Sequence, residues 1–195
     1  MIGILLAAGF SRRFGNANKL MQNLPDGQVM VLAAAQHLIA ALPISIAVVR
    51  AENLALADAL RQLGFQVVMC AEDAAVMADS LVTAVRYAQQ LNLHHDGVVI
   101  ALADMPYIQP HTISQVATLL KQAGGIVVPT YLDQRGHPVG FSAKFINALL
   151  KVEGDHGARA VVKQHAEEVS LLACDDAGIL ADIDTPTDLA KSIGT

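Results

Sequence analysis

Short apolar runs alternate with longer segments of helical period along this chain, and the alternation constrains the fold more than any other feature. Apolar runs of about four to eight residues are typical of strands buried on both faces, as in a mainly parallel sheet. Helices between such strands cover the two faces of the sheet. The pattern therefore predicts an α/β fold with a mostly parallel sheet flanked by helices on both faces. The strands are expected near Ile2 to Ala8, Ile44 to Val49, Gln66 to Cys70, Val98 to Ala103 and Ile126 to Pro129.

Helices are expected between and after these runs, and two of their ends carry recognisable chemistry. Gly64 follows the second helical segment as a stop, and Thr185 can cap a last helix that has Pro186 in its first turn. With 195 residues and no linker rich in Pro, Gly or Ser, we expect a single domain over residues 1–195. The helices are placed near Val29 to Leu42, Asn53 to Leu63, Asp79 to Leu91, Pro110 to Ala123, Ala143 to Leu150, Asp155 to His165 and Pro186 to Ser192.

Composition and charge exclude several classes of partner. Hydrophobic residues make up 53% of the chain and charged residues 16%, which predicts a large core. The net charge is −5 and the basic residues form no long run, so we expect no nucleic-acid and no membrane partner. No apolar stretch reaches the roughly 18 to 20 residues that span a bilayer, and no basic segment precedes the first strand. Cys70 and Cys174 lie in apolar stretches without metal-ligand spacing, which indicates reduced core thiols and a cytoplasmic protein. Together with the charge pattern, this favours small molecules as ligands.

The segment after the first strand is the most informative stretch of the chain. It reads Leu6-Ala7-Ala8-Gly9-Phe10-Ser11-Arg12-Arg13-Phe14-Gly15, and Lys19 follows shortly after it. Gly9 lets a ligand approach the backbone, while Ser11, Arg13 and Lys19 add a hydroxyl and positive charges, which together predict polyphosphate binding. The segment contains neither the GxGxxG pattern of dinucleotide sites nor the GxxxxGK[ST] pattern of P-loops. A solvated strand exit is the alternative explanation.

The LAAGxSxRFG pattern with a lysine a few residues on resembles the signature of the GT-A-like nucleotidyltransferases that act on molybdenum cofactor. Within these MobA-like NTP transferases it is most similar to the molybdenum cofactor cytidylyltransferases. The resemblance implies a Rossmann-like, GT-A-type fold in which the Gly9 loop wraps the triphosphate, Arg13 and Lys19 neutralise it, and Leu6-Ala7-Ala8 lies beside the base. The guanylyltransferases usually carry LAGG where this chain has LAAG, which favours CTP over GTP.

Asp104 is a lone charge at the end of the apolar run from Val98 to Ala103. Open α/β sheets bind their ligands at the C-terminal ends of such strands. An unpaired buried carboxylate is costly, so a partner is expected, and Mg²⁺ is a natural one. An aspartate that caps the helix after Pro106 is the alternative. Leu-Ala-Asp-Met-Pro is also similar to the family's metal-binding motif, so we predict Asp104 as a metal ligand that acts with Arg13 and Lys19 in catalysis.

The second metal carboxylate is expected in Asp182-Ile183-Asp184-Thr185-Pro186, which is similar to the family's DIDTP motif. In an extended segment Asp182 and Asp184 point to the same side. Either can therefore reach the metal while the other serves the start of the following helix. Analogy with related sugar nucleotidyltransferases puts Asp182 first.

Two segments resemble motifs that the family places near the acceptor. Arg135-Gly136-His137-Pro138-Val139 resembles the GHPV segment, which makes His137 a candidate ligand for an anionic group, with a structural histidine as the alternative. The stretch 154–159 is similar to the GD-x-GAR motif. There Asp155 most simply caps the following helix, and Arg159 either reaches the acceptor phosphate or lies on the surface.

One segment departs from the family pattern. The cytidylyltransferases usually carry a GMSSSL-like segment that helps to hold the base, whereas this chain reads Val76-Met77-Ala78-Asp79-Ser80-Leu81. Ser80 is kept as a nucleotide-binding candidate. Asp79 puts a negative charge at a helix N-terminus, where it stabilises the helix but would repel a nearby phosphate. The departure keeps other bases and other acceptors open.

The resemblance implies attack by the phosphate of molybdopterin cofactor on the α-phosphorus of CTP, with release of pyrophosphate and with Mg²⁺ as cofactor. Positioning and charge neutralisation supply most of the catalysis in such transfers. A client molybdoenzyme or its chaperone is the implied protein partner. Two alternatives stay open: the same chemistry with another NTP or phosphorylated acceptor, and a catalytically idle protein that binds nucleotide or cofactor for a client enzyme.

Overall fold

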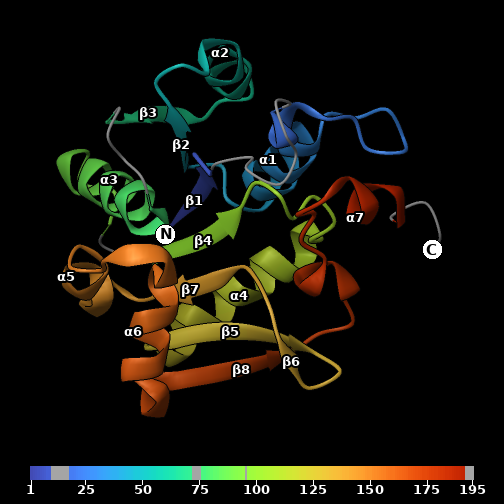
Figure 1. Cartoon of the computed structure of the whole chain (residues 1–195). Coiled ribbons are helices and arrows are strands. Elements are labelled where there is room, and N and C mark those ends of the chain that lie inside the picture. The colour runs from blue at the N-terminus through green and yellow to red at the C-terminus, as the bar shows by residue number, and fades with distance from the viewer. Residues whose placement is uncertain (10–17, 72–75, 95, 192–195) are drawn as a thin grey trace.

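Among the residues that the structure describes, eight strands form one sheet in the order β3-β2-β1-β4-β7-β5-β6, and β8 pairs with β5 off this path (Figure 1). The structure, a computed structural model, describes residues 1–9, 18–71, 76–94 and 96–191. The pairs β1-β2, β1-β4, β2-β3 and β5-β8 are parallel, whereas β7 runs antiparallel between β4 and β5, and β6 runs antiparallel to β5. The strands are β1 (Ile2–Ala7), β2 (Ser45–Arg50), β3 (Gln66–Cys70), β4 (Val98–Leu102), β5 (Ile126–Tyr131), β6 (Gln134–Arg135), β7 (Val139–Phe141) and β8 (Val169–Ala173).

The predicted fold class, a mostly parallel α/β sheet flanked by helices, is confirmed. The five expected strands are present with small shifts at their ends, but the sequence pattern missed β6, β7 and β8. Strands β6 and β7 have two and three residues, which is too short for a period to show. Among the described strands, β8 pairs with β5 alone, and its residues are partly or fully exposed, so it lacks the continuous apolar run of a central strand.

The helices lie on both faces of the sheet (Figure 1). One face is covered by α1 (Met30–Ala41), α2 (Leu54–Gln62) and α4 (Pro110–Ala123). The other is covered by α3 (Met77–Gln90), α5 (Ile146–Leu149) and α6 (Ala158–Gln164), and α7 (Pro186–Lys191) follows near the C-terminus. Short 3₁₀ turns complete the chain: η2 (Lys19–Met21), η3 (Ala143–Phe145), η4 (Gly154–His156), η5 (Ala166–Glu168) and η6 (Ala177–Leu180).

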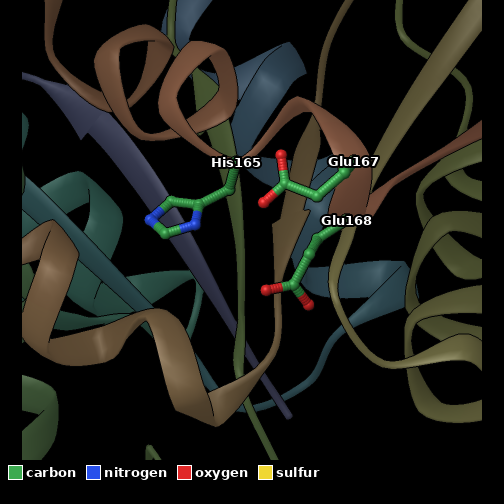
Figure 2. A group of neighbouring side chains, drawn as sticks. All are labelled: His165, Glu167 and Glu168. Atoms are coloured by element: carbon green, nitrogen blue, oxygen red, sulfur yellow. The ribbon is translucent and has the colours of Figure 1, made fainter.

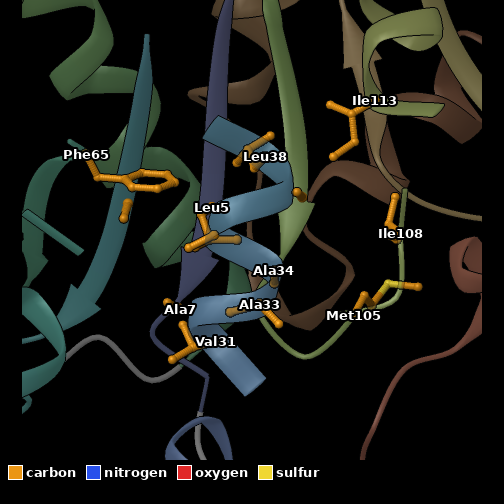
Figure 3. Close-up of a cluster of buried hydrophobic side chains, with 14 of the residues drawn as sticks. Leu5, Ala7, Val31, Ala33, Ala34, Leu38, Phe65, Met105, Ile108 and Ile113 are labelled. Atoms are coloured by element: carbon orange, nitrogen blue, oxygen red, sulfur yellow. The ribbon is translucent and has the colours of Figure 1, made fainter. Parts of the chain in front are cut away.

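Strand β1 separates two apolar cores because its side chains alternate between the faces of the sheet. Leu5 and Ala7 pack with Val31 and Leu38 of α1 in the first core (Figure 3). Ile2 and Ile4 face the second core, beneath α3 and α5. The central strands are thus apolar on both faces, as the continuous runs predicted.

The helices differ from the expected ranges mainly where a glycine interrupts them. The segment expected as one helix from 155 to 165 divides at Gly157, whose φ of 47° lies in the left-handed region that glycine adopts without strain. The last helix begins as expected: Thr185 and Asp188 exchange hydrogen bonds between side chain and backbone, so that each caps the other.

The register of β1 and β4 brings two distant sequence motifs together. The strands are parallel neighbours with Leu6 opposite Leu102, and the backbone N–H of Ala103 donates to the carbonyl of Leu6 at 3.2 Å. The residues after β1 and the residues after β4 therefore emerge side by side at the C-terminal edge of the sheet.

In the parts of the chain that the structure describes, no helix combines the length and the apolar character needed to cross a lipid bilayer.

Candidate functional site

One ammonium group joins two carboxylates at the C-terminal edge of the sheet. Lys19 Nζ donates to Asp104 Oδ2 at 2.8 Å and to Asp184 Oδ1 at 2.9 Å. Lys19 lies in η2 after β1, Asp104 in the turn after β4, and Asp184 in the segment before α7. Because both carboxylates lie within hydrogen-bonding distance of the same atom, they are near enough to bind a single cation.

The turn that carries Lys19 is fixed by its neighbours. The side-chain oxygen of Asn18 caps η2 by accepting from the backbone N–H of Leu20 at 3.2 Å, and the Leu20 side chain is buried. The carbonyl of Asn18 also accepts from the side-chain amide of Gln22. These contacts hold the backbone of Lys19 at the sheet edge, and 12% of its side chain is exposed.

Asp184 reaches the cluster because Ile183 is docked beside Asp104. The Ile183 side chain is 2% exposed, and its backbone N–H donates to the Asp104 carbonyl at 3.0 Å. This pairing places the half-buried side chain of Asp184 against Lys19, whereas Asp182 is exposed. Of the two aspartates that the sequence left open, the structure thus brings Asp184 into contact with Lys19, which also binds Asp104.

The two carboxylates keep Lys19 charged. Burial is the largest single influence and lowers the pKa of Lys19, but the charges and hydrogen bonds of Asp104 and Asp184 outweigh it. The pKa of Lys19 is therefore raised above its ordinary value.

His137 lies near the same cluster and is neutral at physiological pH. Its backbone N–H donates to the Ile179 carbonyl at 3.0 Å. The residue as a whole is partly exposed, yet its Nδ1 is buried and has no hydrogen-bond partner among the described residues. Burial, and secondly the positive charge of Arg159, lower the pKa of His137 to about 4, while Asp104 acts weakly in the opposite direction.

The other predicted site residues lie at varied distances from this cluster. Leu6 is half-buried, Ala7 and Ala8 are buried in the two cores, and Gly9 is exposed with open space where a Cβ would stand. Ser80 is 7% exposed, and its hydroxyl accepts from the Cys70 thiol at 3.7 Å, so it faces the core. Arg159 is exposed on α6. Ser11 and Arg13 lie outside the described residues.

A second group of possible metal ligands lies at the opposite end of the sheet. His165, Glu167 and Glu168 have ligand atoms within 4.8 Å of one another, just before β8 begins (Figure 2). Strands β4, β5 and β8 run in the same direction, so this group lies beyond their N-terminal ends and not at the edge that holds Asp104. Glu168 already pairs with Lys144, and the His165 ring packs edge-on against Phe145.

A hollow of about 570 Å³ opens at that same N-terminal edge. Its lining includes Asp96 before β4, Gly125 before β5 and Ser142 after β7, together with Lys121 and Lys144. It is therefore separate from the Lys19 cluster.

Comparison with known families identifies the family of the chain. Residues 3–169 match the MobA-like NTP transferase domain family. The chain belongs to this family. The predicted resemblance to the MobA-like NTP transferases is thereby confirmed.

Individual relatives of this MobA-like NTP transferase carry different names. It is 29% identical to purine catabolism protein PucB of Bacillus subtilis over 95% of this chain and 92% of that protein. It is 28% identical to nicotine blue oxidoreductase of Paenarthrobacter nicotinovorans over 94% of this chain and 91% of that protein. Among solved structures, Rv0371c of Mycobacterium tuberculosis shares 28% identity with a TM-score of 0.84 over 100% of this chain and 98% of that one. A crystal structure of Rv0371c in complex with manganese is 26% identical to this chain, with a TM-score of 0.79.

Sequence reasoning missed one residue that the structure places at the base of this site. Asp176 is 4% exposed and accepts three hydrogen bonds, two of them from the start of α4. The weak signal for it is an aspartate two residues before a glycine after an apolar run, which is typical of a side-chain-capped turn. That signal does not reveal the residues of α4 that Asp176 contacts.

We predict that His137 makes stability fall in mild acid. Between about pH 6.5 and 4 the unfolded chain binds a proton at His137 that the folded protein does not bind. The contribution of this group to the free energy of unfolding is therefore complete above about pH 6.5 and is lost as the pH falls towards 4, by on the order of 3 kcal/mol. Urea unfolding across this range should give a shallower pH dependence for His137→Gln than for the wild type. The exposed His156→Gln serves as control, and equal slopes for His137→Gln and the wild type would contradict the assignment.

Proposed function

We propose that this MobA-like NTP transferase moves CMP from CTP to the phosphate of molybdopterin cofactor and releases pyrophosphate. The observation that carries the proposal is the Lys19, Asp104 and Asp184 cluster at the C-terminal ends of β1 and β4. Ligands of open α/β sheets bind at this edge. The Leu6 to Gly9 segment ends there as well, with exposed backbone at Gly9.

The residues of the cluster fit a divalent metal ion. Carboxylate oxygens are the ligands that Mg²⁺ prefers, with water and substrate phosphates completing the shell. Asp104 and Asp184 offer two such groups, and the Lys19 ammonium between them is a cation already in place. When bound, Mg²⁺ would supply Lewis-acid polarisation of the α-phosphate. The manganese complex of Rv0371c supports a divalent metal in a relative of the same fold.

Asp184 is favoured over Asp182 as the second carboxylate. Asp184 shares Lys19 with Asp104, and the Ile183 to Asp104 backbone hydrogen bond fixes its position. Asp182 is exposed, on the other side of Ile183 in the sequence. The start of α7 does not need Asp182 either, because Thr185 and Asp188 cap it.

The chain's own residues would bind and orient the two substrates. An oxygen of the acceptor phosphate forms a bond to the α-phosphorus of CTP, and the bond from that phosphorus to the bridging oxygen of pyrophosphate breaks. Lys19 and Arg13 would neutralise the charge that builds up on the leaving pyrophosphate. Lys19 reaches it by exchanging its carboxylate partners for phosphate oxygens, which are equally good acceptors for an ammonium group.

On the acceptor side, His137 and Arg159 would have different roles. A neutral imidazole cannot attract an anion by charge, but its buried Nδ1 lacks a partner among the described residues, and a ring nitrogen can hydrogen-bond a polar group of the acceptor. The exposed guanidinium of Arg159 would then meet the phosphate. Ser80 of α3, whose hydroxyl faces the core in this structure, stays a predicted nucleotide contact. A cytoplasmic location, and a client molybdoenzyme or its chaperone as recipient of the product, complete the proposal.

The first prediction of the proposed function distinguishes the roles of the three aspartates. Asp104→Asn and Asp184→Asn each keep the side-chain shape but remove a charged ligand, so we expect turnover and Mn²⁺ affinity to fall by on the order of 100-fold. Asp182→Asn is the matched control, with turnover within about threefold of the wild type. A large loss in Asp182→Asn together with an active Asp184→Asn would reverse the assignment.

The second prediction concerns Lys19. Lys19→Met removes the charge and keeps much of the apolar length, so CTP binding should weaken by about tenfold to a hundredfold, as for the loss of a charge-assisted hydrogen bond. CMP, which has no distal phosphates, should lose less than about threefold. Calorimetric titration of both nucleotides measures the difference, with the exposed Lys121→Met as control. Equal losses for CTP and CMP would move Lys19 away from the distal phosphates.

The third prediction concerns the base and the acceptor. If the loop lies over the base, Ala8 beside Gly9 leaves less room for a purine, and we expect CTP to be preferred over GTP by roughly tenfold to a hundredfold. A competition assay with both nucleotides and molybdopterin cofactor, scored by product identity, tests the choice. A guanine dinucleotide as main product would overturn the cytidylyl assignment and leave nucleotidyl transfer intact. The absence of any product would favour another acceptor or a binding protein without transfer activity.

A further inference from the structure

Asp176 is a buried carboxylate that none of the motifs above includes. Its side chain is held by three donors: the backbone N–H of Gln109 at 2.9 Å, the hydroxyl of Thr112 at 2.6 Å and the backbone N–H of Gly178 at 3.0 Å. Thr112 is fully buried and Asp176 nearly so. Because all three partners donate, the site needs a group that only accepts, and an ionised carboxylate is such a group.

The three donors belong to two different parts of the candidate site. Gln109 occupies the N-cap position of α4 and is the last residue of the short loop that begins at Asp104. Gly178 lies in η6, which leads directly into the segment that carries Asp184. The Asp176 carboxylate therefore joins the loop after β4 to the segment before α7. It also lies at the N-terminus of α4, where the helix dipole favours a negative charge.

The backbone segments around this carboxylate are in close contact with one another. A Cβ at Gly178 would overlap the carbonyl oxygen of Tyr107, so η6 lies directly against the loop that follows Asp104. A Cβ at Gly136 would overlap the Ile179 carbonyl oxygen, which also accepts from the His137 N–H. The segments that carry Asp104, His137 and Asp184 thus all meet at η6, and Asp176 holds η6 to α4.

We infer that Asp176 is a positioning residue that sets the spacing between Asp104 and Asp184 and so determines how tightly the pair binds a divalent cation. Asp176 itself touches neither substrate nor metal. It acts through η6, whose continuation brings Ile183 onto the Asp104 carbonyl and Asp184 onto Lys19. The inference rests on the proposed function, because it assigns Asp176 a role toward the metal pair of that site.

The test is a double-mutant cycle on Mn²⁺ affinity, measured by electron paramagnetic resonance of free Mn²⁺ with the nucleotide-free full chain. Asp176→Asn should weaken Mn²⁺ binding by about tenfold to a hundredfold, as for groups that orient metal ligands. In an Asp184→Asn background the same change should weaken it by less than about twofold, since the ligand that it positions is already lost. Independent losses that multiply in the double variant would overturn the inference.

Two further variants separate positioning from a general loss of stability. Thr112→Val removes one of the three donors and should weaken Mn²⁺ binding by a smaller factor, so that the inference is tested even if Asp176→Asn does not fold. Ser45→Ala removes a buried hydrogen bond to the Leu42 carbonyl at the start of β2, away from the site. It should lower the melting temperature and leave Mn²⁺ affinity unchanged. Unchanged Mn²⁺ affinity in Thr112→Val, or a loss in Ser45→Ala equal to that in Thr112→Val, would overturn the inference.

Failure of the inference differs from failure of the proposed function. If Asp104→Asn weakens Mn²⁺ binding but Asp176→Asn, correctly folded, does not, the positioning role is wrong and the metal pair stands. If Asp104→Asn itself leaves Mn²⁺ affinity unchanged, the metal pair is wrong, and the role of Asp176 is overturned with it.

Discussion

The ion pairs from one lysine to two aspartates are the interaction on which the rest of the site depends. Two carboxylates that approach each other repel, and a cation between them offsets this repulsion. Lys19 supplies that cation from the turn after β1, while Asp104 and Asp184 arrive from the turn after β4 and from the C-terminal segment. The protein can therefore fold with its two acidic groups already together.

The sheet topology explains why this arrangement forms at one edge and not at the other. Parallel pairing of β1 with β4 puts the Leu6 to Gly9 segment beside Asp104, and the antiparallel β7 brings the His137 segment alongside. The C-terminal segment then joins these parts through η6, Ile183 and the three hydrogen bonds of Asp176. At the N-terminal edge, the group of His165, Glu167 and Glu168 has no comparable convergence of family motifs, and Lys144 already pairs with Glu168.

The sequence predicted what depends on local pattern and missed what depends on tertiary contact. The central strands and the place of Asp104 followed from apolar runs and from a lone charge at a strand end. Which of Asp182 and Asp184 contacts Lys19 could not follow, because the docking of Ile183 on the Asp104 backbone determines it. Asp176 was missed for the same reason, since its partners Gln109 and Thr112 are distant in sequence. Strands β6 and β7 were too short to show any period.

The most direct test of the account is a crystal structure of the protein with Mn²⁺ and CTP, in which anomalous scattering locates the metal. The account predicts a single strong peak within direct coordination distance of Asp104 and Asp184, about 2 Å as for Mg²⁺. It also predicts that Lys19 has turned from the carboxylates to the distal phosphates. A peak at His165, Glu167 and Glu168, with Lys19 still bridging the two aspartates, would contradict it.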